Sequence, residues 1–331
     1  MTKITTCITR GNIIESIHEA KCLILDNNFK TIFSTNHDKD LTFPRSAIKI
    51  FQAIPFVISN AHNKFNLSQK QIAICCASHC GETEHLKVLE QWLKKIKIYP
   101  KMLKCGSHNP LNAKYADKLL LGGSKPNQLH NNCAGKHLGM ISACLANNMK
   151  LSDYVDLDHP HQIKIREILE FFTNCKIYKN QKGIDGCSAP QYAFTLKGLS
   201  TAMINLIKQI NNRDVYVKEV SLLFNSIKKF PQLIGSKEKY DTQLMIATKG
   251  QMFVKGGAEG ILLFVHKKKK IGGVIKVKDG NERAIPSIAN QIFKKLKILN
   301  NYELKILSYW SNQKIYNHAR INVGKIYTEI K

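Results

Sequence analysis

The sequence contains few of the residues that are typical of fibrous or disordered chains. Its 331 residues include only 9 Pro and 19 Gly, which follow no repeating period, while 44% of the residues are hydrophobic. The first two counts exclude a collagen-like or low-complexity architecture, and the hydrophobic content excludes intrinsic disorder. A chain of this length can bury one large core or two ordinary ones. We therefore expect a globular protein and assign residues 1–331 to a single domain.

Cysteines and long apolar runs are also scarce. Ten Cys are too few for a disulfide scaffold in a chain of this length, and the first 20 residues lack the apolar stretch of a signal peptide. No apolar run approaches the ~20 residues that a membrane-spanning helix needs. These absences predict reduced thiols, no membrane partner and a cytoplasmic location.

Acidic residues are outnumbered by basic ones, at 24 against 50, which gives a formal net charge of +26. Such a charge usually indicates nucleic-acid binding. However, 44 of the basic residues are Lys and only 6 are Arg, the side chain that phosphate and base recognition favours. The densest run, Lys267–Lys270, lies between two alternating apolar segments and is typical of a solvated hairpin turn. We expect no nucleic-acid partner and keep a basic nucleic-acid-binding protein as the weakest alternative.

Hydrophobic periodicity predicts strands near both ends of the chain and helices between them. Residues 1–35 alternate around a turn at Asp26-Asn27-Asn28, which indicates a hairpin. Because sequence-distant strands of one domain normally join one sheet, we predict an α+β fold with a five-stranded antiparallel sheet, its β ends at about 1–35 and 250–280. The tail after residue 299 is assigned as a helix or a strand. Late strands are predicted over 251–254, 260–266 and 271–277, and helices over 44–59, 68–77, 82–98, 135–147, 162–172, 196–210, 215–229 and 285–299.

A Ser-x-x-Lys motif, Ser46 to Lys49, falls in the first turn of the first predicted helix. Residues three apart project from one face of a helix, so the two side chains can touch. A serine hydroxyl needs a base to become a nucleophile, and a lysine can serve once burial or a nearby cation lowers its pKa toward about 7 to 8. Alone the motif is weak evidence, because it recurs by chance in many chains.

Further blocks of small and reactive residues follow along the chain. Residues 75–82 present Ser78 at a glycine turn, for which a capped helix boundary is the purely structural interpretation. Residues 132–137 and 185–190 carry cysteines without zinc-finger spacing. Lys255-Gly256-Gly257, on a predicted strand edge, is similar to the Lys-Thr-Gly motif of penicillin-recognising serine enzymes. Ser-x-x-Lys, a second serine and Lys-x-Gly occur in the order that those enzymes use, so the combination is stronger than its parts.

Taken together, the blocks resemble one known family, the rhizobial-type (class 3) L-asparaginases of the asparaginase II family, which have a serine β-lactamase-like fold. The resemblance covers most of the chain. It rests on seven blocks in order: Thr9-Arg10-Gly11 with Glu15-Ser16, Arg45-Ser46-Ala47-Ile48-Lys49, Ala77-Ser78-His79-Cys80-Gly81-Glu82, Asn132-Cys133-Ala134-Gly135-Lys136-His137, Asp185-Gly186-Cys187, Tyr240-Asp241-Thr242 and Lys255-Gly256-Gly257-Ala258-Glu259-Gly260.

The resemblance implies an L-asparagine amidohydrolase that gives L-aspartate and ammonia through a Ser-Lys acyl-enzyme mechanism. The matching motifs imply two catalytic pairs, Ser46 with Lys49 and Ser78 with Lys255, in which Ser46 is the nucleophile. Two lysines that converge on one site repel each other, which favours a neutral lysine as the base. Ser78, between the two lysines, would relay the proton to the leaving ammonia.

Substrate and metal sites are implied by the same motifs. Arg45, His137 and Asp185 match positions that line the substrate or metal site, and we assign the backbone N–H groups of Ser46 and Ala258 to the oxyanion.

Zinc, one ion per chain, would be held by Cys133, Lys136 and Cys187. Because a Ser-Lys centre already supplies nucleophile and base, we expect zinc to modulate substrate binding. Cys80 stands where many relatives carry a serine. The resemblance also implies a homodimer.

Another acyl-transfer enzyme of the same fold, a β-lactamase or a peptidase, is the second interpretation. Ammonia release from asparagine would distinguish the first interpretation from the second. Covalent labelling by a penicillin would favour the second, and salt-sensitive retention on nucleic acid would favour the nucleic-acid-binding alternative.

Overall fold

The computed structural model of the chain describes residues 2–211 and 214–331. Contacts between Cα atoms divide the chain into two compact units, each of which we describe by itself. Unit 1 consists of Met1–Ala47, Phe194–Ile207 and Gln243–Lys331, and unit 2 of Ile48–Ala193 and Lys208–Thr242. The single-domain assignment stays a prediction. Within the described ranges, no helix combines the length and the apolar character that crossing a membrane requires.

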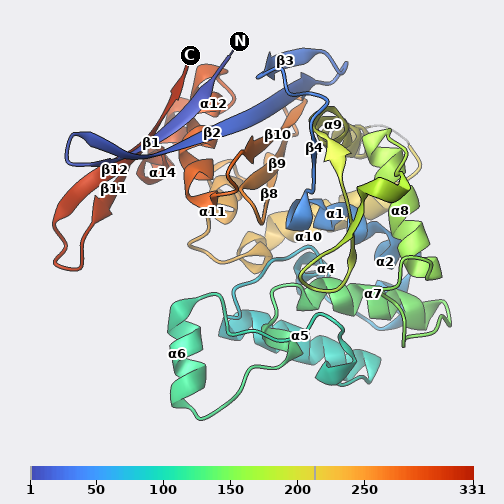
Figure 1. Cartoon of the computed structure of the whole chain (residues 1–331). Coiled ribbons are helices and arrows are strands. Elements are labelled where there is room, and N and C mark those ends of the chain that lie inside the picture. The colour runs from blue at the N-terminus through green and yellow to red at the C-terminus, as the bar shows by residue number, and fades with distance from the viewer. Residues whose placement is uncertain (1, 212–213) are drawn as a thin grey trace. The chain divides into compact units, whose positions relative to one another are not determined.

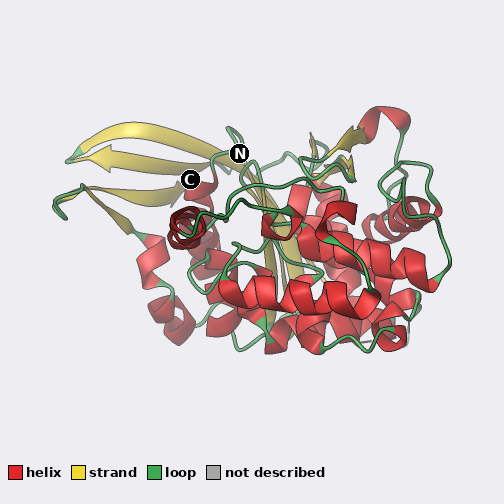
Figure 2. Ribbon diagram, turned by 90° about the horizontal axis from the view of Figure 1, so that it is seen from below, coloured by secondary structure: helices red, strands yellow, loops and turns green. Residues whose placement is uncertain are grey.

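Unit 1 is built on an eight-stranded antiparallel sheet in the order β11-β12-β1-β2-β10-β9-β8, with β3 paired to β2. Strands from the two ends of the chain lie side by side in it, and Ile4 of β1 is in register with Ile330 of β12 (Figure 1). The strands are β1 (Ile4–Arg10), β2 (Ile13–Asp26), β3 (Thr31–Ser34), β8 (Met252–Gly257), β9 (Ile261–His266), β10 (Ile271–Val277), β11 (Gln313–Tyr316) and β12 (Asn322–Ile330). Figure 2 shows the long curved strands in yellow.

The α+β class, with an antiparallel sheet contributed by both chain ends, is confirmed, but the predicted number of five strands is wrong. The hairpin around Asp26 forms as β2 and β3. A second hairpin, β1–β2, turns at Gly11 with φ +57° and was not predicted. Strands β11 and β12 were also missed, because most of their residues are exposed or half-buried and give no clear apolar alternation.

Helices cover both faces of the sheet of unit 1. Successive strand residues point to opposite faces, and on β9 Phe264 packs on Phe293 of α12 (Ile285–Lys295), with ring centroids 4.8 Å apart. On β10, a Cβ at Gly272 would lie 3.0 Å from the Cβ of Met203 in α9 (Leu196–Asn211). A second contact fixes α9, since the Ser200 hydroxyl donates to the Leu23 carbonyl at 2.9 Å.

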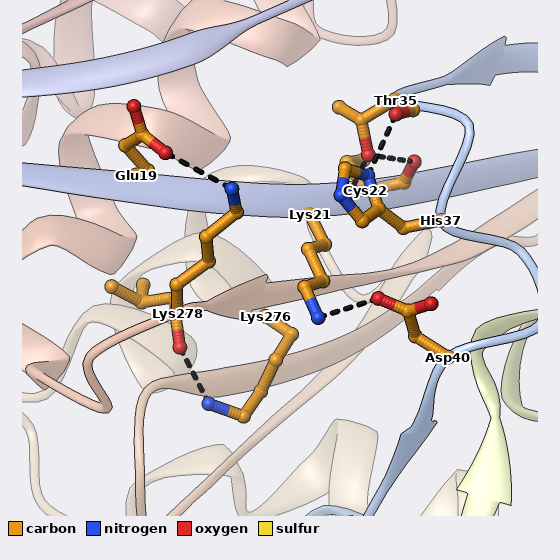
Figure 3. Close-up of polar contacts among 9 residues, drawn as sticks. Glu19, Lys21, Cys22, Thr35, His37, Asp40, Lys276 and Lys278 are labelled. Atoms are coloured by element: carbon orange, nitrogen blue, oxygen red, sulfur yellow. Dashed lines mark hydrogen bonds and ion pairs between the residues drawn. The ribbon is translucent and has the colours of Figure 1, made fainter.

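Polar contacts beside β2 fix the chain that leads out of the sheet (Figure 3). Thr35 Oγ1 accepts the N–H of Cys22 at 3.0 Å, and Lys21 pairs with Asp40 at 2.5 Å. The chain then forms β4 (Leu41–Thr42), which pairs with β7 (Phe194–Thr195). These contacts hold the segment that leads to the turn containing Ser46.

Unit 2 is helical, with α7 (Ala134–Ala146) as its central element (Figure 1). Glycines allow α7 to approach the end of α4 (Gln69–Ile74) very closely. A Cβ at Gly135 would lie 2.1 Å from the Ile74 carbonyl oxygen, and a Cβ at Gly139 would lie 2.3 Å from Cys75 Sγ. The other helices that lie within this unit are α1 (Lys49–Gln52), α2 (Ile54–Ile58), α3 (Ala61–Lys64), α5 (Thr83–Ile96), α6 (Ala113–Leu121), α8 (Pro160–Thr173) and α10 (Val217–Lys229).

Most predicted helices form within a few residues of their expected bounds. The predicted helix over 44–59 is the exception, because it is broken into the 3-10 helix η1 (Arg45–Ile48), α1 and α2. Helix α6 was not predicted, and none of its residues is buried. Three further helices are α11 (Tyr240–Ala247), α13 (Asn301–Ile306) and α14 (Ser308–Ser311), and β5 (Lys182–Ile184) pairs with β6 (Pro190–Tyr192).

Candidate active site

Ser46 lies in a constrained turn of unit 1. The preceding residue, Arg45, has φ +50°, a left-handed conformation that is uncommon for a residue other than glycine and that is often found at functional sites. Gly257, at the end of β8, lies against this turn: a Cβ there would be 2.5 Å from the Pro44 carbonyl oxygen and 3.1 Å from the Ala47 nitrogen. Only glycine allows this approach, which places the end of β8 directly beside the Ser46 turn.

Lys255 lies on the same strand, two residues before Gly257. Its side chain is buried, and its Nζ donates to the Gly256 carbonyl at 2.9 Å. Ala258, which follows the strand, is half-buried. The predicted residues Ser46, Lys255, Ala258 and Arg45 thus all belong to unit 1.

Lys49 and Ser78 meet inside unit 2. Lys49, the first residue of α1, is 0% exposed, and its Nζ donates to the Ala77 carbonyl at 2.6 Å and to Ser78 Oγ at 3.0 Å. Ser78 itself is half-buried. The predicted pairs joined Ser46 to Lys49 and Ser78 to Lys255, and those pairings stay predictions. Within unit 2, Lys49 contacts Ser78.

The three predicted metal ligands converge in unit 2. Cys133 precedes α7, Lys136 lies in its first turn, and Cys187 comes from the loop after β5. All three side chains are buried, Lys136 Nζ donates to Cys187 Sγ at 3.0 Å, and the Cys133 and Cys187 thiols are hydrogen-bonded to each other. Sequence spacing alone did not bring Cys187 to this point, since it lies 51 residues from Lys136.

Charges in this cluster favour a thiolate beside an ammonium group. The hydrogen bond from Cys133 and the charge of Lys136 lower the pKa of Cys187 to about 4, against the opposing effect of burial. The same hydrogen bond and burial raise the pKa of Cys133 to about 12. Burial works to lower the pKa of Lys136, but the charges of Cys187, Cys133 and Asp185 outweigh it and raise that pKa.

Asp185 shapes the loop that carries Cys187. Its backbone N–H donates to the Ala189 carbonyl at 2.9 Å, and its carboxylate accepts the N–H of Gly186 at 2.8 Å and the side-chain amide of Gln191 at 3.3 Å. The carboxylate is half-buried and close enough to act on the pKa of Lys136. Asp185 therefore stands beside the thiol–amine cluster, and its role at a substrate or metal site stays a prediction.

His137 is fully buried and contacts Tyr154, a residue that sequence reasoning missed. Tyr154 Oη accepts the N–H of Lys104 at 2.8 Å and lies within hydrogen-bond distance of His137 Nδ1, at 2.7 Å. His137 Nε2 finds no partner within residues 2–211 and 214–331. Burial lowers the pKa of His137 to about 3. No motif surrounds Tyr154 in the sequence, so nothing pointed to it.

The comparisons with known proteins agree with these motifs. The sequence model of the family described as L-asparaginase II matches residues 6–328. The chain belongs to the L-asparaginase II family. It is therefore an L-asparaginase, a hydrolase that acts on amides, and the resemblance is confirmed. No curated protein matches the sequence. One similar solved structure is titled "Crystal structure of putative beta-lactamase from Bacteroides dorei DSM 17855", with 11% identity, a TM-score of 0.43, and coverage of 83% of this chain and 93% of that chain.

Proposed function

We propose that this asparaginase hydrolyses L-asparagine to L-aspartate and ammonia through an acyl-enzyme on Ser46. The family match over residues 6–328 supports the substrate. The observation that carries the mechanism is the buried Lys49 amine 3.0 Å from Ser78 Oγ. Ser-Lys catalysis requires a desolvated lysine in contact with a serine hydroxyl.

In the first step, Ser46 Oγ attacks the side-chain amide carbon of asparagine while Lys49 accepts the hydroxyl proton. The negative charge that develops on the amide oxygen would be held by the backbone N–H groups of Ser46 and Ala258. The contact of Gly257 with Pro44 and Ala47 supports this assignment, because it brings the strand that leads to Ala258 beside the Ser46 turn.

In the second step, the carbon–nitrogen bond breaks and the proton passes from Lys49 through the Ser78 hydroxyl to the departing nitrogen, giving ammonia. Lys255, the second lysine of the predicted set, would complete this relay with Ser78. Water then attacks the ester carbonyl, Ser46 Oγ leaves and regains its proton, and L-aspartate is released. The proton that leaves Ser46 in acylation departs with ammonia, and the attacking water replaces it in deacylation, so the enzyme ends in its starting state.

Zinc fits the donors that converge at Cys133, Lys136 and Cys187. Two sulfurs and one amine are buried at one point, and thiolates are strong zinc ligands. Within the described ranges no three His, Cys, Asp or Glu side chains are placed to hold a metal together. The proposed third ligand is Lys136, whose ammonium group would have to lose its proton to bind zinc. When bound, zinc would supply a positive centre for substrate positioning, while Arg45, His137 and Asp185 would contact the substrate.

An ammonia-release assay across the free amino acid amides tests the substrate. We expect asparagine to be turned over and glutamine poorly, because the longer side chain misplaces its amide relative to Ser46. Ser46→Ala and Lys49→Met should each abolish turnover, and the double variant should resemble either single variant, because the two residues act as one unit. Ser152→Ala, at an exposed serine, is the matched control. Equal rates with glutamine, or a Ser46→Ala enzyme with near wild-type activity, would refute this assignment.

Metal analysis of protein purified without chelator tests the zinc proposal. We expect about one zinc per chain. Cys133→Ser and Cys187→Ser should lose the metal, whereas Cys80→Ser should keep it. Chelated protein should bind asparagine more weakly but retain some turnover. Complete, zinc-reversible loss of turnover would make the enzyme a metallohydrolase and would remove the roles given to Ser46 and Lys49.

We also propose that the enzyme is a cytoplasmic homodimer. This proposal rests on the resemblance to the class 3 asparaginases. Sedimentation equilibrium at micromolar concentration should give twice the mass of 37.5 kDa, and a monomer at that concentration would contradict it.

A further inference from the structure

The loop that carries Ser78, residues 77–82, runs from α4 to α5 and is held by backbone hydrogen bonds within unit 2. The N–H of Ser78 donates to the Ile234 carbonyl at 2.8 Å, and the N–H of Cys80 donates to the Gly235 carbonyl at 3.2 Å. Between these two anchors the side chain of His79 is completely buried. The loop then turns at Gly81, which has φ +73° and lies so close to Pro110 that a Cβ would be 2.9 Å from it.

Two histidine rings accept the backbone N–H groups of this turn. The N–H of Gly81 donates to His79 Nδ1 at 3.2 Å, and the N–H of Glu82 donates to His85 Nδ1 at 3.2 Å. The two rings are stacked, with centroids 5.3 Å apart and an interplanar angle of 27°. Because a backbone N–H can only donate, each Nδ1 must present a lone pair, and both rings carry their proton on Nε2.

We propose that His79, as the neutral Nε2–H imidazole, is a positioning residue that holds the Ser78 loop so that Ser78 Oγ stays within hydrogen-bond distance of Lys49. This inference rests on the proposed role of Ser78 as proton relay. His79 is the neighbour of Ser78 in the chain, and its Nδ1 closes the turn two residues ahead. The ring therefore acts on the hydroxyl through the backbone rather than through contact with the substrate.

The surroundings of the two rings oppose protonation. Burial is the largest cause that lowers the pKa of His79, followed by the charges of His85 and Lys49. Burial also lowers the pKa of His85. An added proton would remove the lone pair that the N–H of Gly81 needs. The groups that act on these rings are Lys49, His108 and His130 toward His79, and Glu82, Glu84 and the Gln232 carbonyl toward His85.

The other nitrogen of the His79 ring, Nε2, also supports a role for Nδ1. His79 Nε2 is buried and has no hydrogen-bond partner among the residues that the structure describes. A buried donor without a partner costs about 1–3 kcal/mol, so an apolar ring of similar size would suit the packing better. Unlike phenylalanine, histidine supplies an acceptor for the N–H of Gly81.

Two substitutions separate the acceptor from the ring. His79→Phe keeps an aromatic ring on His85 but has no acceptor. His79→Asn keeps an acceptor for the N–H two residues ahead, the geometry of an Asx turn, and has no group that titrates. We expect His79→Phe to lower kcat for asparagine at least tenfold with KM changed less than threefold, and His79→Asn to restore kcat to within threefold of the wild type. His161→Leu, at a buried histidine outside this loop, is the control and should keep kcat.

The tautomer is measured directly on the unmodified protein by ¹⁵N NMR of labelled histidine. We expect His79 to show a protonated Nε2 and an unprotonated Nδ1 at pH 7 and still at pH 5.5. An Nδ1–H tautomer, an imidazolium at pH 7, or equal kcat for His79→Phe and wild type would each overturn the proposal. If the wild type releases no ammonia from asparagine, the proposed function fails, while the spectrum still decides the state of His79. The spectrum also decides it if both variants fail to fold.

Discussion

Replacing Gly139 by alanine should destabilise the protein because a sulfur atom occupies the space that the new methyl group needs. The Cβ would lie 2.3 Å from Cys75 Sγ. Its next neighbours, Phe56 Cγ and Cys75 Cβ, are at ordinary contact distances of 3.7 and 3.8 Å. Forcing an extra methyl group into a packed core costs about 1–3 kcal/mol. The better helix propensity of alanine returns about 1 kcal/mol. We therefore expect Gly139→Ala to lower the free energy of unfolding by up to about 2 kcal/mol.

Removing the sulfur should reverse the sign of this effect. In a Cys75→Ala background the clash is gone, and only the propensity gain of up to about 1 kcal/mol remains. Urea denaturation of the wild type, the two single variants and the double variant gives the coupling free energy, which we expect to be about 2 kcal/mol. Gly135→Ala is the matched control, since its Cβ would clash with the Ile74 backbone oxygen at 2.1 Å, which Cys75→Ala leaves in place. A Gly139→Ala cost that is the same in both backgrounds would refute the packing argument.

Three further predictions concern other parts of the molecule. Burial lowers the pKa of His161 to about 3, against about 6.5 in the unfolded chain, so stability falls as the pH drops below 6.5. In urea titrations, the free energy of unfolding should fall between pH 7.5 and pH 5.0 by about 2 kcal/mol less in His161→Leu than in the wild type. Equal losses in the two proteins would contradict this. Tyr154→Phe removes the hydroxyl that orients His137, and should raise KM for asparagine more than it lowers kcat; an unchanged KM would exclude a substrate contact by His137. Asp40→Asn breaks a partly exposed ion pair with Lys21 and should cost less than about 1 kcal/mol by thermal unfolding, a difference that high salt removes.

The fold was predictable where burial imposes a period on the sequence. Strands β8, β9 and β10 are buried almost throughout, and their predicted bounds lie within one residue of the observed ones except at the end of β8, which runs to Gly257 rather than to residue 254. Helix α6 has no buried residue and the edge strand β11 alternates only between exposed and half-buried positions, so neither contributes a buried apolar run. Hydrophobic periodicity reflects the residues that an element buries, so an element that buries few residues is harder to predict.

The candidate site was predictable to the level of motifs but not of contacts. Ser46 and Lys49 were paired from their spacing, because a helical turn brings residues three apart together, and that pairing stays a prediction. The contact of Lys49 with Ser78, 29 residues away, and that of Lys136 with Cys187 depend on how helices pack. Tyr154 shows the limit most clearly, since its role comes entirely from its position beside His137.

The pairing of β1 with β12 sets an order of events during synthesis on the ribosome. Thr6 and Thr328, whose hydroxyls are 2.8 Å apart in the finished sheet, leave the ribosome about 15–65 s apart at ~5–20 residues per second. Throughout that interval β1 can pair with β2 on one side only, and its other edge presents open backbone groups to any extended chain nearby. Slow translation or high expression should therefore lead to aggregation through β1, and the nascent chain is the form of this asparaginase that most needs a chaperone.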